Sequence, residues 1–262
     1  WLEEGLIDRL IIGGLYQNAC TGAEELIALG HRHGVPVYPS FRIDSPLFGT
    51  GLPKGGVPPH SAEALRGHAA NLWNAGADGL YLWNYHYIRT STHPRGQPLP
   101  EDYRFLSEIG EPSRLARLDK IFVVNPADEN LKGIWPFFLV SAPVALPVPI
   151  TAAPAQRHTV PVRIGDDIQA AAEQGALKSM TLGIKLDADP ERLGLVVRFN
   201  GQEVGDGAHR AVDSNWWIDF ALQPAIVKQG INQLEVAMRE AGPRTEDAPQ
   251  LVQVWVTVRY KS

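Results

Sequence analysis

Three segments in the first half of the chain share one pattern, in which a helical segment ends at a glycine and an apolar, strand-like segment begins two or three residues later. They span Glu4–Gly14, His33–Phe41 and Ala75–Tyr85. The strand-like part of each is largely apolar rather than alternating, which is typical of strands covered on both faces. The pattern therefore predicts parallel strands.

Helical patterns lie between these strands, over about 22–33 and 61–74. Thr21 and Ser61 stand at the positions of N-caps, and a glutamate follows each of them. Strands and helices that alternate in this order predict a βαβ architecture. A further short strand, over 121–124, is expected to leave this unit.

The pattern changes after about residue 135 to short strands of period two, separated by turn residues. They are expected over 158–164, 179–186, 193–199, 216–222, 232–239 and 251–260, with one helix over 167–174 that ends at Gly175. Asn200-Gly201 is typical of a two-residue β-hairpin loop. This spacing predicts an antiparallel β-sandwich. We therefore expect an α/β domain over 1–134 and a β-sandwich domain over 135–262.

Composition and charge exclude several classes of protein. The formal net charge is -5 and lysine and arginine are scattered, so a surface that follows nucleic acid is not expected. The single cysteine, Cys20, excludes an internal disulfide and a cysteine-based zinc finger. No apolar run approaches the ~20 residues of a membrane-spanning helix, so membrane insertion is not expected. Because Trp1–Gly5 has the pattern of the last turn of a helix, we expect the chain to be part of a longer protein.

Polar and aromatic side chains follow the predicted parallel strands, where chemistry in such sheets and barrels is usually located. In chain order they are Tyr16, Arg42, Asp44, Trp83, Asn84, Tyr85 and His86, and we call these seven residues the predicted sugar site. Aromatic faces can stack on a pyranose, while Arg, Asn, Asp and His form directional hydrogen bonds with hydroxyl groups. A place in the core is the alternative for Trp83, Tyr85 and His86, and it is favoured for Tyr81.

Asp44 is the one carboxylate of this set that we select as catalytic. Glycoside hydrolysis normally uses two carboxyl groups held ~5 to 9.5 Å apart, and only one clear candidate is visible. Asp8 and Asp78 precede their strands, so they are expected at the opposite edge, where they accept backbone hydrogen bonds. Glu101 and Asp102 are better explained as the start of a helix.

No metal ion or cofactor is implied. His31 and His33 are two residues apart on a helix and point to different faces, so a solvated surface explains them better than a metal site. The glycine-rich segment 49–56 lacks the Ser or Thr that follows the lysine of a phosphate-binding loop.

The segment Ala69–Tyr85, with Ala-Gly-Ala-Asp-Gly before an aromatic-rich strand and Asn84, resembles the last βα unit of bacterial glycosyl-hydrolase-like (β/α)8 proteins. Trp1–Asp8, Val35–Phe41 and 109–120 are similar to the same group. The resemblance implies that the three strands are the last three of a barrel. It also implies that 135–262 is the β-sandwich that often follows such barrels.

A complete barrel needs about 250 residues and eight strands, so this chain can supply only the last three βα units. In many barrel glycosidases the acid/base follows the fourth strand and the nucleophile follows the seventh. The first position has no counterpart here. The second corresponds to Arg42-Ile43-Asp44, where no glutamate stands.

These observations predict a carbohydrate-active protein, a glycoside hydrolase that acts on a polysaccharide or oligosaccharide. The alternative is a non-catalytic carbohydrate-binding or structural module. The expected partners are carbohydrate and the missing N-terminal half of the barrel, and analogy with the family suggests a secreted or periplasmic protein.

Trp216 and Trp217 separate the two possibilities for the sandwich, because adjacent residues of a strand face opposite sides. An outward tryptophan in an open polar groove would indicate glycan binding. An outward tryptophan buried against residues before 135 would indicate structural support.

Overall fold

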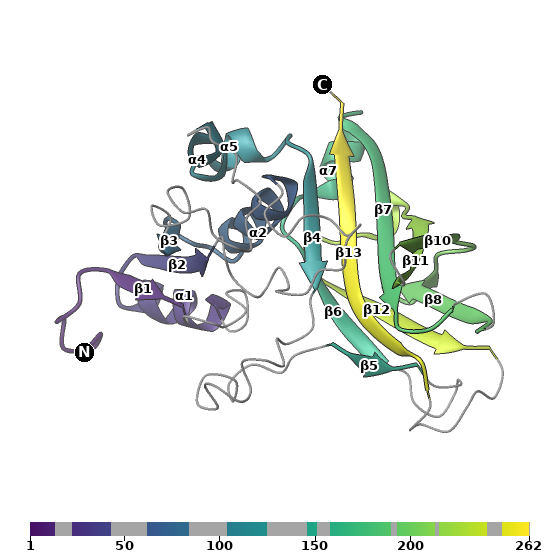
Figure 1. Cartoon of the computed structure of the whole chain (residues 1–262). Coiled ribbons are helices and arrows are strands. Elements are labelled where there is room, and N and C mark those ends of the chain that lie inside the picture. The colour runs from purple at the N-terminus through teal and green to yellow at the C-terminus, as the bar shows by residue number, and fades with distance from the viewer. Residues whose placement is uncertain are drawn as a thin grey trace, which may run out of the picture.

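The computed structural model describes residues 1–13, 23–42, 62–83, 104–124, 146–150, 158–189, 193–212, 215–239 and 248–261. These residues form three sheets and five α-helices (Figure 1). The fold is mixed and mostly sheet, and it is compatible with an α/β part joined to a β-sandwich. The described strands do not close a barrel, so a partial (β/α)8 barrel remains a prediction.

The α/β part contains a parallel sheet of three strands, as the sequence predicts. The strands are β1 (Leu10–Ile12), β2 (Val37–Arg42) and β3 (Tyr81–Trp83), in the order β1-β2-β3. Both pairings are parallel, and the connections contain α1 (Ala23–Arg32) and α2 (Ala62–Asn74). Ile27 of α1 and Val37 of β2 are buried together in a small core. This arrangement confirms the βαβ order.

The β-sandwich part contains two antiparallel sheets. One has the order β10-β11-β7-β13-β4, with β5 also paired to β13, and the other has the order β6-β12-β8-β9. The strands of the first are β4 (Lys120–Val124), β5 (Val148–Pro149), β7 (Leu177–Leu186), β10 (Ala208–Val212), β11 (Asn215–Ala221) and β13 (Gln250–Tyr260). Those of the second are β6 (His158–Ile164), β8 (Leu195–Phe199), β9 (Gln202–Glu203) and β12 (Gly230–Met238). All six strands predicted after residue 135 are present, within a few residues of the expected ends.

Turn and cap residues occupy the positions that the sequence indicates. Asn200 and Gly201 connect β8 to β9 with φ angles of 51° and 80°, as a type I′ hairpin turn requires. The side chain of Asp167 caps α7 (Ile168–Glu173) by accepting a hydrogen bond from Ala170 N at 3.0 Å. The remaining helices are α4 (Arg104–Ile109), α5 (Pro112–Leu115) and the 3-10 helix η3 (Pro224–Ile226).

The strand β4 belongs to the sandwich rather than to the parallel sheet. It pairs with β13 in an antiparallel register that places Val123 opposite Trp255. The strand was expected to leave the first unit, and its pairing with β13 shows that it joins the sandwich. The predicted domain boundary near residue 135 lies outside the described residues and stays a prediction.

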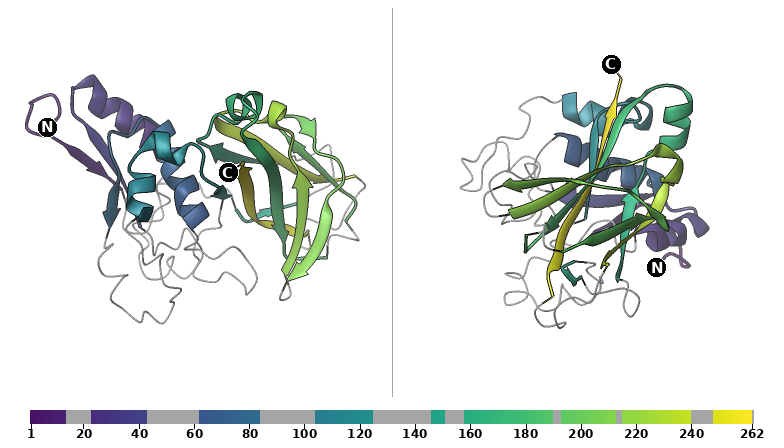
Figure 2. Two further views of the ribbon diagram at one scale, coloured as in Figure 1. Left: turned by 90° about the horizontal axis from the view of Figure 1, so that it is seen from above. Right: turned by 90° about the vertical axis from the view of Figure 1, so that its right-hand side faces the viewer.

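The helix α2 packs against both parts, and Figure 2 shows it between the parallel strands and the sandwich. Its residues Leu65 and Leu72 belong to the same buried cluster as the interior of both sandwich sheets. A Cβ atom on Gly67 would lie 2.2 Å from the carbonyl oxygen of Ile121, and one on Gly165 would lie 2.3 Å from that of Ala70. The backbones therefore pack together so closely that only glycine fits at these two positions.

Polar contacts reinforce this junction. Arg163 of β6 forms an ion pair with Glu24 of α1. Arg259 of β13 lies 3.1 Å from Asp119 and 3.5 Å from Glu63 of α2. The α/β part and the sandwich are thus joined by a shared core and by ion pairs at its border.

His68 on α2 should make the stability of the fold depend on pH. Its Nε2 atom is buried, and burial lowers the pKa of the imidazole to about 4 from an ordinary value of 6.5. Between these values the unfolded state binds more protons than the folded state, so the free energy of unfolding falls as the pH falls from 6.5 to 4. The loss attributable to His68 is at most about 3 kcal/mol.

Urea unfolding at pH 7 and pH 4.5 measures this effect. The variant His68→Gln should lose less stability between the two pH values than the parent protein. The control His33→Gln removes an exposed histidine and should behave like the parent. An identical pH dependence in His68→Gln and the parent would contradict the assignment.

Candidate functional site

The carboxyl ends of β2 and β3 lie side by side, as the predicted sugar site requires. The parallel register pairs Arg42 with Trp83 at these ends. The side chains of these two residues, and the whole of Tyr16, Asp44, Asn84, Tyr85 and His86, lie outside the described residues. The described strands show only that these two strand ends are neighbours, and the predicted sugar site stays a prediction.

Asp78 lies at the opposite edge of the parallel sheet and has a structural role. Its Oδ2 atom accepts a hydrogen bond from Val37 N at 2.7 Å and lies 2.7 Å from His31 Nε2. The hydrogen bond from Val37 N, followed by the one from His31, lowers the pKa of this carboxyl group below its ordinary value. The expectation that Asp78 accepts a backbone hydrogen bond before its strand is confirmed.

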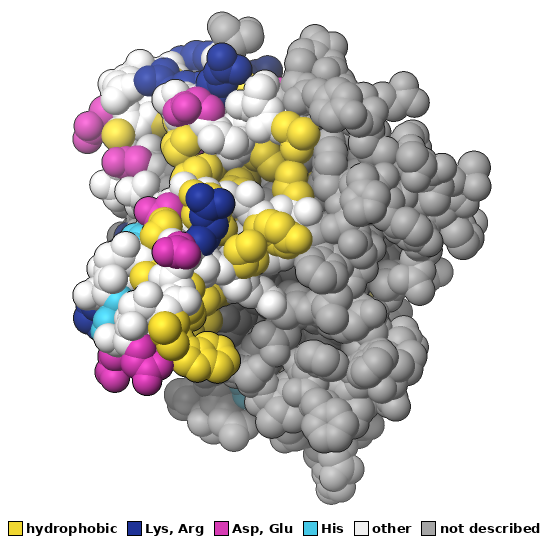
Figure 3. Space-filling view, turned by 90° about the vertical axis from the view of Figure 1, so that its left-hand side faces the viewer, with side chains coloured by type: hydrophobic (Ala, Val, Ile, Leu, Met, Phe, Trp, Pro, Cys, Tyr) yellow, Lys and Arg dark blue, Asp and Glu magenta, His cyan; other side chains and the backbone are white. Residues whose placement is uncertain are grey.

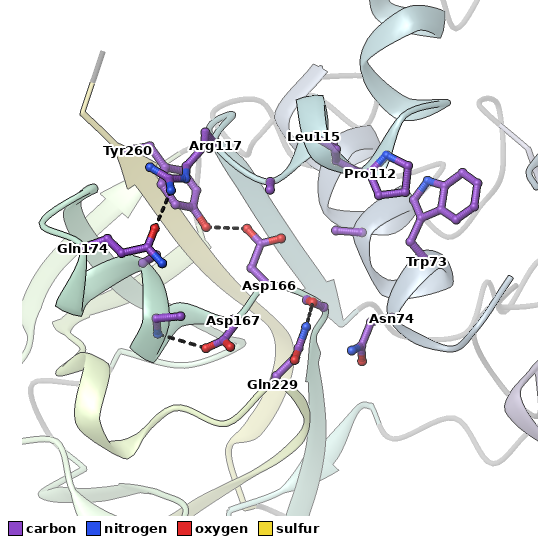
Figure 4. A pocket seen from close by; sticks show the side chains of 15 residues that line it. Trp73, Asn74, Pro112, Leu115, Arg117, Asp166, Asp167, Gln174, Gln229 and Tyr260 are labelled. Carbon is purple, nitrogen blue, oxygen red and sulfur yellow. Dashed lines mark hydrogen bonds between the residues drawn. The ribbon is translucent and has the colours of Figure 1, made fainter.

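A cavity of about 520 Å³ lies between the C-terminal end of α2, the helix α5 and the helix α7 (Figure 4). We call it the interface cavity. The helix α2 contributes Trp73 and Asn74 to its wall, and the segment after β6 contributes Asp166 and Asp167. Gln229 lines it as well. Its volume lies within the range of roughly 300–1,000 Å³ that is usual for small-molecule sites.

A buried cluster of Lys120, Asp166 and Tyr260 stands beside this cavity. Lys120 Nζ lies 2.9 Å from Asp166 Oδ2 and donates a hydrogen bond to Leu118 O at 2.9 Å. The hydroxyl group of Tyr260 donates to the same oxygen of Asp166 at 2.5 Å, and Figure 4 shows the other carboxylate oxygen turned away from the tyrosine. Lys120 is fully buried, and Asp166 is 7 % exposed.

Burial shifts the pKa values of all three groups. It lowers the pKa of Lys120 and raises the pKa of Asp166, and in both cases the attraction between the two charges opposes the shift. Burial, followed by the nearby Asp166, raises the pKa of the Tyr260 hydroxyl. Shifted groups are typical of active sites, but structural ion pairs produce the same shifts. Because Lys120 and Tyr260 meet Asp166 inside the fold, we assign the cluster first to structure: it ties β4 and β13 to the end of β6.

No sequence pattern predicts this cluster. Lys120 precedes an apolar strand and Asp166 stands between a strand and a helix, and neither position carries a recognisable motif. The neighbouring Asp167 is the cap of the predicted helix, so the local pattern explains it without reference to a site. The three members of the cluster are separated by 46 and 94 residues, a relation that no local pattern displays.

Trp216 and Trp217 lie on opposite faces of β11, as expected. Trp216 is partly buried against the sandwich core, while Trp217 belongs to a separate cluster with Trp255 and Ile121. The rings of Trp217 and Trp255 are stacked with centroids 3.9 Å apart, and the guanidinium of Arg210 lies 4.8 Å from the centre of the Trp217 ring. Trp217 is fully buried, so it offers no open surface to a glycan. Its neighbour Ile121 precedes residue 135 but lies on β4 of the same sheet, so this contact is internal to the sandwich.

The described ranges contain no group of three or more His, Cys, Asp or Glu side chains that could hold a metal ion. Across those same ranges, none of the helices combines the length and the apolar character needed to cross a membrane.

Comparisons with known proteins give little guidance. No family model and no curated protein matches the chain. A solved structure of a β-porphyranase of glycoside hydrolase family 86, from the human gut bacterium Bacteroides plebeius, is similar at 12% sequence identity and a TM-score of 0.29. The match covers 55% of this chain and 21% of that one, so the chain spans about a fifth of that protein's length. A similarity at this level assigns neither fold nor function.

Proposed function

We propose that the chain is part of a carbohydrate-active protein, in which the last βα units of a (β/α)8 barrel carry a sugar site and the β-sandwich supports them. The observation that carries this proposal is the parallel register that pairs Arg42 with Trp83 at the carboxyl ends of β2 and β3. Loops after parallel strands are where such folds place their binding residues. In this proposal Arg42, Asp44, Asn84 and His86 bind sugar hydroxyl groups, and Tyr16, Trp83 and Tyr85 provide stacking surfaces.

Exposed apolar side chains support the idea that the α/β part packs against more of a barrel. Among the described residues, the α/β part holds most of the exposed large apolar side chains, and Ile231 of β12 is the exception. Those of the α/β part are Trp1, Leu6, Ile11, Leu26 and Tyr81. Figure 3 shows apolar side chains gathered on the side of the molecule that carries the N-terminus. Ile11 lies on β1, which is the edge strand of the described parallel sheet. Apolar residues concentrated in one region are typical of a surface that is covered by a partner.

The second candidate function is that of a structural module, and the sandwich favours it. Trp217 is buried, and the core of the sandwich continues into α2. We therefore propose that the sandwich holds the α/β part in place, and that glycan recognition belongs to the strand ends.

Binding of oligosaccharides tests the sugar site. The variant Arg42→Ala should weaken the binding of the best ligand of a glycan panel by roughly 10- to 100-fold, because a hydrogen bond with a charged group contributes about 1.5–3 kcal/mol. Isothermal titration calorimetry measures the change. The matched control Arg32→Ala removes an exposed arginine at the end of α1 and should leave the affinity unchanged. Equal affinities for the parent and Arg42→Ala would refute the proposed site.

Glycoside hydrolysis is the finer form of this proposal, with Asp44 as the catalytic carboxylate. Such a reaction needs a second carboxyl group, which we assign to another part of the full-length protein. In that protein, Asp44→Asn should abolish the release of reducing sugar while the ligand still binds. Unchanged turnover would remove Asp44 from the mechanism and leave the chain as a binding module.

A further inference from the structure

The interface cavity lies away from the predicted sugar site. The helix α2 returns from the carboxyl edge of the parallel sheet to its amino edge, because it connects two parallel strands. Trp73 and Asn74 stand at the C-terminal end of α2, towards the amino edge. The cavity therefore needs an explanation that is independent of Arg42 and the other strand-end residues.

Three polar side chains of the cavity wall have donor or acceptor atoms that are not used in hydrogen bonds with other described residues. The exposed amide of Asn74 forms no hydrogen bond with the residues described. Asp167 uses Oδ1 to cap α7, and its second oxygen remains as an acceptor. Gln229 uses Nε2 to donate to Gly165 O at 2.9 Å, which leaves its amide oxygen. Together they provide one amide donor and several acceptors, which is a set that suits hydroxyl groups.

Trp73 provides a fixed aromatic surface on the α2 side of the same cavity. Its indole N–H donates to Ile109 O at 2.7 Å, and this bond holds the ring in place. Figure 4 shows the ring beside Pro112. The side chain is only partly buried. A ring that is already held in position can stack on a ligand with little further loss of conformational entropy.

The charges of the cavity wall are of both signs and nearly cancel, which suits a ligand without net charge. Asp166 is balanced by Lys120, which leaves the guanidinium of Arg117, hydrogen-bonded to the neutral Gln174 at 2.5 Å, and the carboxylate of Asp167 on the wall. Of the remaining acceptor atoms, one belongs to the carboxylate of Asp167 and the others to the neutral amides of Asn74 and Gln229. We propose that the interface cavity is a second ligand site that takes a neutral saccharide unit, stacked near Trp73 and bound through its hydroxyl groups by Asn74, Asp167 and Gln229.

The test measures saccharide binding by isothermal titration calorimetry in the Arg42→Ala background, so that the contribution of the predicted sugar site is reduced. The probes are glucose, galactose, xylose, maltose, cellobiose and lactose, with glucuronate and glucosamine as charged comparators. At least one neutral probe should bind saturably. The double change Asn74→Ala/Gln229→Ala should weaken that binding by at least about tenfold, because two neutral hydrogen bonds are lost.

The control Gln202→Ala removes an exposed glutamine of β9 and should leave the binding unchanged. Asn74 and Gln229 are exposed, and the double variant loses only the hydrogen bond from Gln229 to Gly165 O, so its unfolding temperature should fall by no more than a few degrees, which a thermal scan verifies. Saturable binding by none of the neutral probes, binding of a charged comparator alone, or unchanged affinity in the double variant would each overturn the proposal. Binding that is lost in Arg42→Ala, but kept when Asn74→Ala/Gln229→Ala is made with Arg42 intact, would support the strand-end site and reject this one.

Discussion

Replacement of Lys120 by methionine should lower the free energy of unfolding at pH 7 by about 3 kcal/mol. Methionine fills a similar volume but removes the charge that balances the buried carboxylate of Asp166. Removing one partner of a buried ion pair typically costs about 3–5 kcal/mol. Because burial already raises the pKa of Asp166, this group can take up a proton, and the cost should fall at the lower end of that range. Urea unfolding at pH 7 gives the value.

Lys185→Met is the matched control for this prediction. Lys185 lies in β7 of the same sheet and is nearly buried, but no described carboxylate pairs with its amine. Burial alone lowers its pKa, so the change to methionine should alter the free energy of unfolding by less than about 1 kcal/mol or increase it.

A double variant separates the loss of the ion pair from a loss of packing. Lys120→Met combined with Asp166→Asn should recover most of the lost stability, because a neutral amide can still contact Tyr260 without an unbalanced charge. If the costs of the two changes simply add, Lys120 and Asp166 do not stabilise each other. That result would contradict our description of the buried cluster.

The variant Gly67→Ala should destabilise the protein by about 2 to 3 kcal/mol, although alanine is normally the better residue inside a helix. The intrinsic gain of alanine over glycine there is about 1 kcal/mol. A Cβ atom at this position would lie 2.2 Å from the carbonyl oxygen of Ile121 and 2.8 Å from its carbonyl carbon. These are backbone atoms of β4, which cannot rotate away like a side chain, so α2 must move off the sandwich. Chemical unfolding measures the result.

Gly175→Ala provides the comparison for a glycine with space around it. Gly175 has a φ angle of +65° and no heavy atom within 4 Å of the added Cβ, so only the left-handed backbone conformation opposes the change. The expected cost is about 1 kcal/mol. A gain in stability for Gly67→Ala would mean that α2 does not pack directly on β4.

Much of the fold could be predicted because its signals are local. The apolar strand segments and their glycines predict β1, β2 and β3 as parallel, and the pairings agree. Asn200-Gly201 predicts a hairpin because both residues tolerate a positive φ angle. The strand β10 was not predicted, since Ala-His-Arg-Ala-Val lacks clear alternation and forms its strand through pairing with β11.

The two candidate sites also differ in whether the sequence predicts them. The position of Arg42 and Trp83 at adjacent strand ends follows from the order of strands and helices, which local sequence patterns predict. The interface cavity follows from the packing of α2, α5 and α7 around the segment after β6, and the sequence contains no motif for it.

The amino-acid sequence by itself determined the elements, their order and the turns that connect them, because those depend on the preferences of residues close together in the chain. The tertiary structure alone decided that β4 joins the sandwich, that Gly67 and Gly165 bring two backbones into contact, and that Lys120, Asp166 and Tyr260 share one buried site. Such relations join segments that are distant in the chain. These relations form only when the chain folds, because apolar faces then pack together and buried charges are stable only when they are paired.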